Sequence, residues 1–205
     1  RGARKAARQT RDTQMLPALE RRLPLTEPMS QEQIERIDDA SMNILENVGV
    51  QFRDPIALDD WKKAGAKVEG EFVYLDRHLV KELISSIPSS FTIHARNHAN
   101  DLPFGYDHSI FVPMTGAPYL RDLDDVRREP TLADLGNFHK LSHMLPAIHS
   151  SAHHIVEPGD HPISQRHLRI TYSSMKHSDK TFMGMTTSPK NAEDVMDMCA
   201  ILFGE

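Results

Sequence analysis

The chain has 205 residues, of which 39% are hydrophobic and 26% are charged, and its formal net charge is -5. This length and composition are typical of a globular protein that buries a core within one or two domains. No apolar run approaches the ~20 residues that cross a bilayer, which excludes a transmembrane helix. The single cysteine excludes a disulfide framework or a cysteine-based zinc site, and it favours a reducing, cytoplasmic compartment.

Charge is distributed unevenly along the chain. Residues 1–22 contain seven basic and two acidic side chains, whereas the remainder contains 17 basic and 27 acidic ones. A basic arm before an acidic body is typical of a mobile tail, and this arm lacks the apolar centre of a secretory signal. We therefore expect residues 1–29 to form a basic, flexible arm; binding of an anionic partner and a transit peptide are the alternatives.

Residues 30–100 predict an N-terminal helical layer with short strands. The layer opens on a capping box, in which the side chains of Ser30 and Gln33 each accept a hydrogen bond from the other residue's N–H. Apolar residues then recur at helical spacing up to Gly49, which is expected to end the helix. Further patterns predict helices that begin at Asp54 and Asp76, a small hairpin over 68–74 and a strand over 91–95.

Residues 101–205 predict an alternation of strands and helices, in which each principal strand is followed by a helix. Strands are expected over 110–114, 119–123, 147–151 and 181–185, and helices over 131–144, 162–176 and from Ser188 onward. This alternation requires a parallel sheet, and a repeat of about 35 residues suits a (β/α)8 barrel or a doubly wound sheet.

Glycine spacing decides between these two folds. Gly116, Gly159 and Gly184 are isolated, so the glycine-rich phosphate loops of dinucleotide-binding folds and of P-loops are absent. The predicted fold class is α/β: the N-terminal portion of a TIM (β/α)8-type barrel, preceded by a helical layer with small β hairpins. Three units cannot close a barrel, so we expect residues 101–205 to hold its first βα units and the chain to be truncated from a longer protein.

The loop after the 147–151 strand, SAHHIVEPGDHP, carries three histidines and two carboxylates within twelve residues. In parallel α/β folds, the loops at the carboxyl ends of the strands form the active site. Adjacent residues of an extended segment point to opposite faces, so His153 and His154 are not expected to share a metal ion. One of the two is expected to face the barrel mouth, as a hydrogen-bond donor or an acid-base group.

Other polar patterns are interpreted structurally. His139 and His143 lie four residues apart on a predicted helix without the glutamate of a zincin motif, and both are expected to be solvated. Ser150 and Ser151 lie near His153, but no G-x-S-x-G elbow supports a catalytic triad.

The acidic loop that begins at Asp122 lacks the glycine and glutamate that a calcium loop needs at its sixth and twelfth positions. Three arginines accompany its aspartates, so a salt-bridged loop is predicted. The run Met183-Gly184-Met185 is interpreted as core packing.

The run SQEQIERI at residues 30–37, followed by ILENVGV at residues 44–50, resembles the opening of the trimethylamine methyltransferase family, the corrinoid-dependent amine methyltransferases. Members of this family look like TIM barrels of roughly twice this length or more. The resemblance covers residues 30–205 in order and continues through KAGAKV at 63–68, IPSSF at 87–91, HARN at 94–97, TGAP at 115–118, Asp122-Leu123 and TLADL at 131–135.

The resemblance implies an enzyme that demethylates trimethylamine or a quaternary amine such as a betaine and passes the methyl group to the Co(I) of a separate corrinoid protein. It implies a small methylated amine as substrate and a corrinoid protein as partner, with no cofactor bound directly by this chain. Membrane and nucleic-acid partners are not expected, and a homo-oligomer is compatible with it. In the trimethylamine-specific branch, pyrrolysine would lie beyond residue 205; we favour the branch without it.

Aromatic faces and carbonyl or carboxylate oxygens suit a quaternary ammonium ion. The family reaction therefore suggests a group of substrate-binding candidates, while no catalytic residue and no metal ligand is assigned. These candidates are Tyr106, Phe111, Thr115, Tyr119, His153, His154, Glu157 and Thr186. Two alternatives stay open: a barrel lyase or hydrolase with His153 or His154 as base, and a non-catalytic fragment or interaction module whose basic arm binds an acidic partner.

Overall fold

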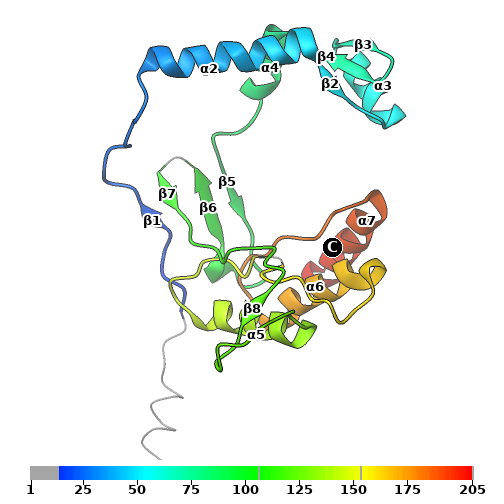
Figure 1. The fold of residues 1–205 in the computed structure, drawn as a ribbon. Helices are drawn as coiled ribbons and strands as arrows, with labels where there is room; N and C mark the ends of the chain where they lie inside the picture. Colours follow the sequence, from blue (N-terminus) through cyan, green and yellow to red (C-terminus); the bar gives the residue numbers. More distant parts are fainter. Residues whose placement is uncertain (1–13, 106, 153, 205) are drawn as a thin grey trace, which may run out of the picture. The chain divides into compact units, whose positions relative to one another are not determined.

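The computed structural model describes residues 14–105, 107–152 and 154–204 (Figure 1). These described residues form two compact units: residues 14–22 with 90–204 make up unit 1, and residues 23–89 make up unit 2. Among them, no helix combines the length and the hydropathy that crossing a membrane requires.

Unit 2 begins with the predicted capped helix, α2 (Gln31–Asn43), which continues as a π-helical turn, η1 (Ile44–Val48). The capping box is confirmed, because Gln33 N donates to Ser30 Oγ over 3.3 Å and Ser30 N donates to Gln33 Oε1 over 2.9 Å. Gly49 ends the helix with φ 76°, and a Cβ there would come within 2.9 Å of Val73 O. Glycine is therefore required at this position, both for its backbone conformation and for the close approach to β4 (Phe72–Tyr74).

The rest of unit 2 follows the predicted order. The expected hairpin is present, and a third short strand extends it into an antiparallel sheet of order β2-β4-β3, with Val73 fully buried. Asp54 and Asp76 cap their helices as expected. The elements are β2 (Val50–Gln51), α3 (Pro55–Lys63), β3 (Lys67–Glu69), β4 (Phe72–Tyr74) and α4 (Arg77–Ser85).

Unit 1 contains three short antiparallel pairs. β1 (Leu19–Glu20) pairs with β7 (His108–Ser109), β5 (Ser90–Ile93) with β6 (Leu102–Gly105), and β8 (Leu120–Arg121) with β9 (Arg127–Arg128). The 91–95 strand is therefore confirmed as β5, whereas the 119–123 strand is reduced to two residues. A short 3-10 helix, η2 (His98–Asn100), lies in the connection from β5 to β6.

The predicted salt-bridged loop is confirmed between β8 and β9. Arg121 NH1 lies 2.9 Å from Asp125 Oδ1, and Arg128 Nε lies 3.6 Å from Asp122 Oδ2. Asp125 takes a positive φ of 61°, which a short polar side chain tolerates at a tight turn.

The long strands expected over 110–114, 147–151 and 181–185 are not formed as continuous strands. Three segments instead lie in parallel at these places, joined by isolated bridges at Ser150–Thr181 and Ala117–Val156. No closed sheet is present among the described residues, and the fold is a mixture of helix and strand compatible with α/β. We call these the first segment (110–117), the second segment (149–152 with 154–157) and the third segment (181–185).

Side chains of the second segment make hydrogen bonds in place of some of the backbone bonds of a regular β ladder. Phe111 N donates to His149 Nδ1 over 2.8 Å, and Ser150 Oγ donates to Thr181 O over 2.9 Å while accepting from Ala152 N over 3.1 Å. Ala152 itself has φ 55°, outside the β region. Local side-chain bonds of this kind compete with strand pairing, which explains why the parallel ladder is interrupted.

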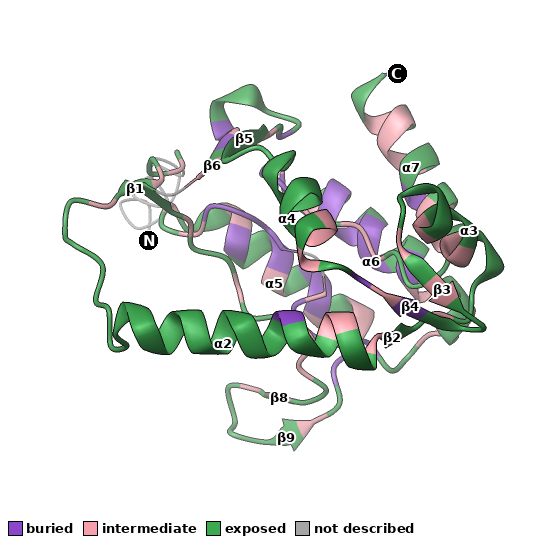
Figure 2. Cartoon of the chain, turned by 90° about the horizontal axis from the view of Figure 1, so that it is seen from above, coloured by how far each residue is buried: buried purple, intermediate pink, exposed green. Residues whose placement is uncertain are grey.

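Three helices pack on these segments: α5 (Leu132–Met144), α6 (Ile163–His177) and α7 (Pro189–Phe203). Thr131 and Ser188 cap α5 and α7 as predicted, and Gly204 ends α7 in the left-handed conformation. Figure 2 shows buried residues along α5 and α6. The buried apolar cluster consists of Leu135, Ala152, Ile155, Val156 and Ile170.

The prediction that His139 and His143 are solvated is wrong. His139 is fully buried between α5 and α6, where Nδ1 lies 3.0 Å from Ser173 Oγ and Nε2 lies 3.3 Å from Ser174 Oγ. His143 is partly buried and lies 3.2 Å from Asp179. Small serines on α6 allow close helix packing and satisfy the imidazole, so the polar face of α5 is buried while Leu141 is 54% exposed.

Residues 14–22 of the predicted basic arm form part of unit 1. Leu16 N donates to Pro146 O over 3.0 Å, and Arg21 N donates to Asp107 O over 2.7 Å. Because His149 Nδ1 accepts from Phe111 N, its Nε2 carries the proton and donates to Pro17 O at 3.3 Å. Residues 1–13 of the arm lie outside the described residues.

A buried lysine joins two connections of unit 1. Lys180 is 2% exposed, and its Nζ donates to the carbonyl oxygens of Ser142, Leu145 and Ile148 at 2.8, 2.9 and 2.5 Å. Burial lowers the pKa of this amine. The three carbonyls belong to the end of α5 and the chain just after it, so Lys180 fixes the start of the third segment against the start of the second.

Asp134 is expected to make a measurable contribution to stability. Its carboxylate accepts from Arg128 at 2.7 and 2.8 Å and from Thr131 N at 2.8 Å, and the Arg128 bond is the main cause of its lowered pKa. Asp134→Asn should lower the free energy of unfolding by about 1–2 kcal/mol, because the amide loses the charge that pairs with the partly exposed Arg128. Urea unfolding measures this change, with the exposed Asp124→Asn as the matched control.

The pH dependence of the same variant follows from the lowered pKa. A carboxylate with a depressed folded pKa stabilises the protein above its unfolded pKa of about 4, and this contribution is lost as pH falls toward the folded pKa. The stability gap between wild type and Asp134→Asn should therefore narrow below about pH 4. A gap that stays constant down to acid unfolding would contradict the ion-pair assignment.

Gly184 is expected to be required by packing. A Cβ at this position would overlap Cγ1 of Val195, which is buried on α7. Gly184→Ala should therefore lower the free energy of unfolding by about 1–3 kcal/mol, the usual cost of overpacking. In the double variant Gly184→Ala/Val195→Ala the clash is removed, so its loss of stability should be smaller than the sum of the losses in the two single variants. A loss equal to that sum would rule out the clash.

Candidate functional site

The carboxyl ends of the first and second segments meet side by side. Gly116 N donates to His154 O over 2.8 Å, Ala117 N donates to Ile155 O over 3.3 Å, and Glu157 N donates to Ala117 O over 3.0 Å. The second and third segments are joined by bonds from Ser151 N to Thr181 O and from Met183 N to Ala152 O. Because parallel segments end at one edge, the loops that follow them share that edge.

Gly116 allows this edge to form closely. Its φ of 78° lies in the left-handed region, and a Cβ there would lie 3.6 Å from His154 Nε2. A larger residue would be strained by the backbone angle and would fill the space beside the imidazole. The TGAP run therefore has a local role, because it brings the backbone of the first segment close to the side chain of His154.

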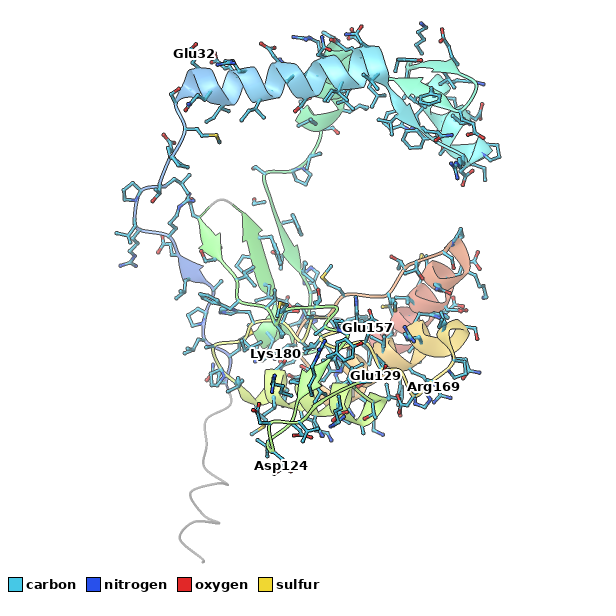
Figure 3. All side chains as sticks on the ribbon, viewed as in Figure 1. Glu32, Asp124, Glu129, Glu157, Arg169 and Lys180 are labelled. Carbon is cyan, nitrogen blue, oxygen red and sulfur yellow. The ribbon has the colours of Figure 1, made fainter. Side chains whose placement is uncertain are left out.

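His154, Glu157 and Arg166 form a chain of charged and polar groups at this edge. His154 Nε2 lies 2.9 Å from Glu157 Oε1, and Arg166 NH1 lies 3.4 Å from Glu157 Oε2. The three side chains are 20%, 27% and 23% exposed, so each is partly shielded from water. Glu157 is labelled in Figure 3, and Arg166 lies in the first turn of α6.

The arrangement places a carboxylate between an imidazole and a guanidinium. The guanidinium holds one oxygen of Glu157 in place, and the imidazole fixes the other oxygen. An oriented, partly desolvated carboxylate attracts a cation more strongly than a fully hydrated one, because fewer waters compete. Glu157 is therefore the group of this cluster that could attract a positively charged ligand, and the adjacent Arg166 offsets part of its charge.

The two described aromatic candidates lie in different surroundings. Tyr119 is 46% exposed, and the Arg127 guanidinium lies over its ring at 4.1 Å from the centroid. Phe111 stacks on His149 with ring centroids 5.9 Å apart, at the amino-terminal part of the first segment. Phe111 is thus not brought to the edge that carries His154.

Thr115 and Thr186 are both exposed. Thr115 directly precedes Gly116 near the carboxyl end of the first segment, and Thr186 directly follows the third segment, so both lie near the shared edge. Tyr106 and His153 lie outside the described residues. The structure therefore brings His154 and Glu157 together, and Thr115 and Thr186 lie near the same edge.

Arg166 is the member of the cluster that sequence reasoning missed. It lies in a predicted helix whose charges had no assigned role, and its partner is nine residues away in sequence. A usable signal exists: a basic residue in the first turn of a helix that follows a βα loop is placed beside that loop's side chains. The geometry of the loop, not the spacing alone, selects Glu157 as its partner.

Comparisons with known proteins agree on one family. A family model described as trimethylamine methyltransferase (MTTB) matches residues 1–205. A glycine betaine methyltransferase from Desulfitobacterium hafniense strain Y51 is 42% identical over 182 residues, which cover 89% of this chain and 38% of that protein. The chain thus spans less than half the length of this relative.

Two further relatives are more distant. An L-carnitine:corrinoid methyltransferase from Eubacterium limosum is 26% identical over 113 residues, covering 55% of this chain and 23% of the relative. A trimethylamine methyltransferase MttB from Desulfitobacterium hafniense strain DSM 10664 / DCB-2 is 23% identical over 181 residues, covering 85% of this chain and 36% of the relative.

Proposed function

The chain belongs to the trimethylamine methyltransferase family, and we propose that it forms part of an enzyme that transfers a methyl group from a methylated amine to the Co(I) of a corrinoid protein. Two relatives carry corrinoid methyltransferase in their names, which supports a corrinoid protein as partner. The corrinoid is then a substrate presented by that partner rather than a group held by this chain. A lyase or hydrolase has no support among the named relatives.

We further propose a quaternary amine of the glycine betaine class as methyl donor. The observation that carries this choice is the 42% identity to a glycine betaine methyltransferase over 89% of the chain, against 23% to a trimethylamine methyltransferase. The chemistry is consistent with it. When the C–N bond of a quaternary ammonium breaks, its electron pair stays on nitrogen and a neutral tertiary amine leaves, so no proton has to be supplied.

The three parallel segments are proposed to be the first strands of a TIM barrel. Their parallel bridges, each followed by a helix, support this assignment. In such a barrel, His154 and Glu157 would stand at the carboxyl-end mouth, where the amine binds. A reducing cytoplasmic setting fits the single cysteine and the reactivity of Co(I), and it stays part of the proposal.

The contribution of Glu157 is expected to be in substrate binding. Its carboxylate attracts the ammonium cation, but the positive charge leaves nitrogen as the methyl group departs. This attraction therefore weakens toward the transition state and stabilises the bound substrate more than the reacting one. His154 and Arg166 act by fixing the carboxylate, and the chain needs no acid or base at this point for a quaternary donor.

Variants of Glu157 and His154 test the site. In the complete protein, Glu157→Gln should raise KM for the amine about tenfold, or about 1.4 kcal/mol, while changing kcat less, because the neutral amide loses the charge that attracts the quaternary ammonium. His154→Ala should also impair methyl transfer, because the carboxylate loses one of its anchors. His161→Ala, in the same loop, is the control; full activity in both variants would reduce the cluster to a polar rim.

The substrate choice is tested by methylation of Co(I)-cobalamin, followed by its absorbance. The complete protein should accelerate transfer from glycine betaine and leave trimethylamine unreacted. Transfer from trimethylamine alone would contradict the substrate class. No transfer from any methylated amine, with a corrinoid protein supplied, would overturn the proposed reaction.

A further inference from the structure

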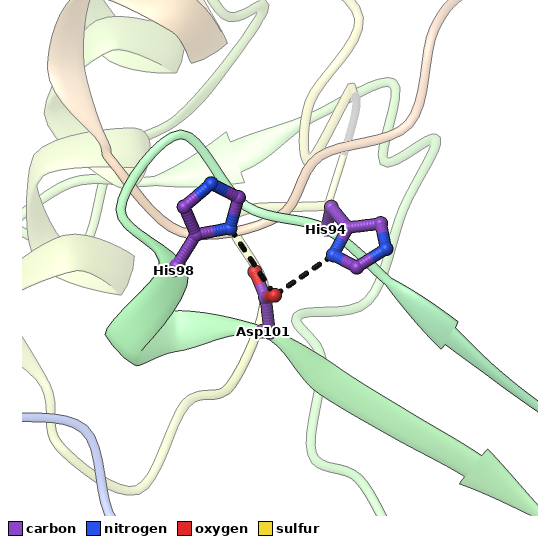
Figure 4. A group of neighbouring side chains, drawn as sticks. All are labelled: His94, His98 and Asp101. Atoms are coloured by element: carbon purple, nitrogen blue, oxygen red, sulfur yellow. Dashed lines mark hydrogen bonds and ion pairs between the residues drawn. The ribbon is translucent and has the colours of Figure 1, made fainter.

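The connection between β5 and β6 gathers two histidines and an aspartate outside the site described above. His94 Nδ1 lies 2.8 Å from Asp101 Oδ2, and His98 Nδ1 lies 3.3 Å from the same oxygen (Figure 4). One donor atom from each of the three residues lies within 4.8 Å of the other two. Three side chains of metal-ligand type therefore converge on one point.

The fold builds this convergence from backbone geometry. Ile93 pairs with Leu102 at the end of the β5–β6 ladder, so His94 and Asp101, the next residues on each strand, face each other across the connection. The η2 turn brings His98 back toward the same point. Ala95 N donates to Asp101 Oδ1 over 2.7 Å, which orients the carboxylate and leaves Oδ2 to the histidines.

The backbone under the cluster is held firmly. Asn97 and Asn100 donate to the Asp179 carboxylate at 3.1 and 3.0 Å, and Arg96 donates to Met175 O and Ser178 O. Ala95 and Asn100 are buried. The His94 and His98 side chains, in contrast, are 68% and 82% exposed. A ligand can therefore reach the cluster from solvent without any movement of the backbone.

We propose that His94, His98 and Asp101 bind a divalent transition-metal ion, for which Zn²⁺ is the best match. Zn²⁺ binds imidazole nitrogen and carboxylate oxygen, and tetrahedral sites at about 2.0–2.1 Å per bond place neighbouring ligand atoms roughly 3.3 Å apart. The His98–Asp101 separation already has this value, and the His94–Asp101 separation has to open by a few tenths of an ångström. Water from the exposed side completes the coordination.

Two imidazole rings approach the same oxygen of Asp101, and a carboxylate oxygen can accept from both. The ring centroids lie 6.0 Å apart with the planes at 77°. A metal ion among the three groups would take the place of the two Nδ1 protons that face Asp101 Oδ2, and each neutral ring would then carry its proton on Nε2.

The position of the cluster indicates a structural role. Asn97 N donates to Asp179 O, two residues before the third segment starts at Thr181. The cluster thus belongs to the amino-terminal edge of the parallel segments, whereas His154 and Glu157 belong to the carboxyl edge. In parallel α/β folds the amino-terminal edge serves stability. The ion would close the β5–β6 connection and take no part in methyl transfer.

Zinc binding by the complete, chelator-treated protein tests this proposal. Titration calorimetry with Zn²⁺ alone should find one binding event that is weakened at least tenfold in His98→Ala. His98 is the best residue to replace, because its contacts are to the other members of the cluster and its exposure predicts an intact fold. His108→Ala, an exposed histidine outside the cluster, is the matched control and should bind as wild type does.

A stability readout separates this site from the other histidines of the chain. Zn²⁺ should raise the Tm of wild type and of His108→Ala, and it should leave the Tm of His98→Ala unchanged. Equal zinc affinity and an equal Tm shift in His98→Ala and wild type would overturn the proposal, as would the absence of zinc binding by wild type. Neither outcome depends on methyl transfer, so the test stands apart from the proposed reaction.

Discussion

A buried ammonium group determines how the parallel segments of unit 1 are aligned. Lys180 Nζ donates to three carbonyl oxygens at and just beyond the end of α5, where the helix dipole presents partial negative charge. Those carbonyls precede the second segment, and Lys180 itself precedes the third. Because a buried charge without partners is costly, the two connections have to stay in contact, and the segments that leave them start in register.

Side chains rather than a full ladder then hold these segments together. His149 accepts the backbone N–H of Phe111, and Ser150 bonds both to its own segment and to the third one. Toward the carboxyl ends the backbone takes over, with Gly116 and Ala117 bonded to the second segment. Backbone bonds therefore hold the segments together at the end where the His154 and Glu157 side chains contact each other.

The two edges of the parallel segments have different chemistry. At the carboxyl edge, a partly shielded carboxylate lies between an imidazole and a guanidinium, an arrangement suited to a cationic substrate. At the amino edge, exposed imidazoles face a carboxylate held by a backbone N–H, an arrangement suited to a metal ion. Under the two proposals above, the stabilising ion and the substrate would be bound at different edges and would not compete.

Local features were predictable from the sequence. The caps at Ser30, Asp54 and Asp76, the 68–74 hairpin and the order of helices after residue 130 depend on residues a few positions apart, and the structure confirms them. The family resemblance also rests on local runs in a constant order, and the match over residues 1–205 confirms it. The place of the His154 loop at the end of a segment followed from the alternation of strand and helix.

What the sequence could not determine depends on contacts between distant residues. His139 is buried because Ser173 and Ser174, more than thirty residues away, satisfy its ring. Arg166 contacts Glu157 only because α6 packs beside the loop. The parallel ladder is replaced by side-chain hydrogen bonds only where His149 and Ser150 bond to other segments. Caps and periodicity are set by neighbours along the chain, whereas the partner of a buried polar group is chosen by packing, which tertiary structure alone decides.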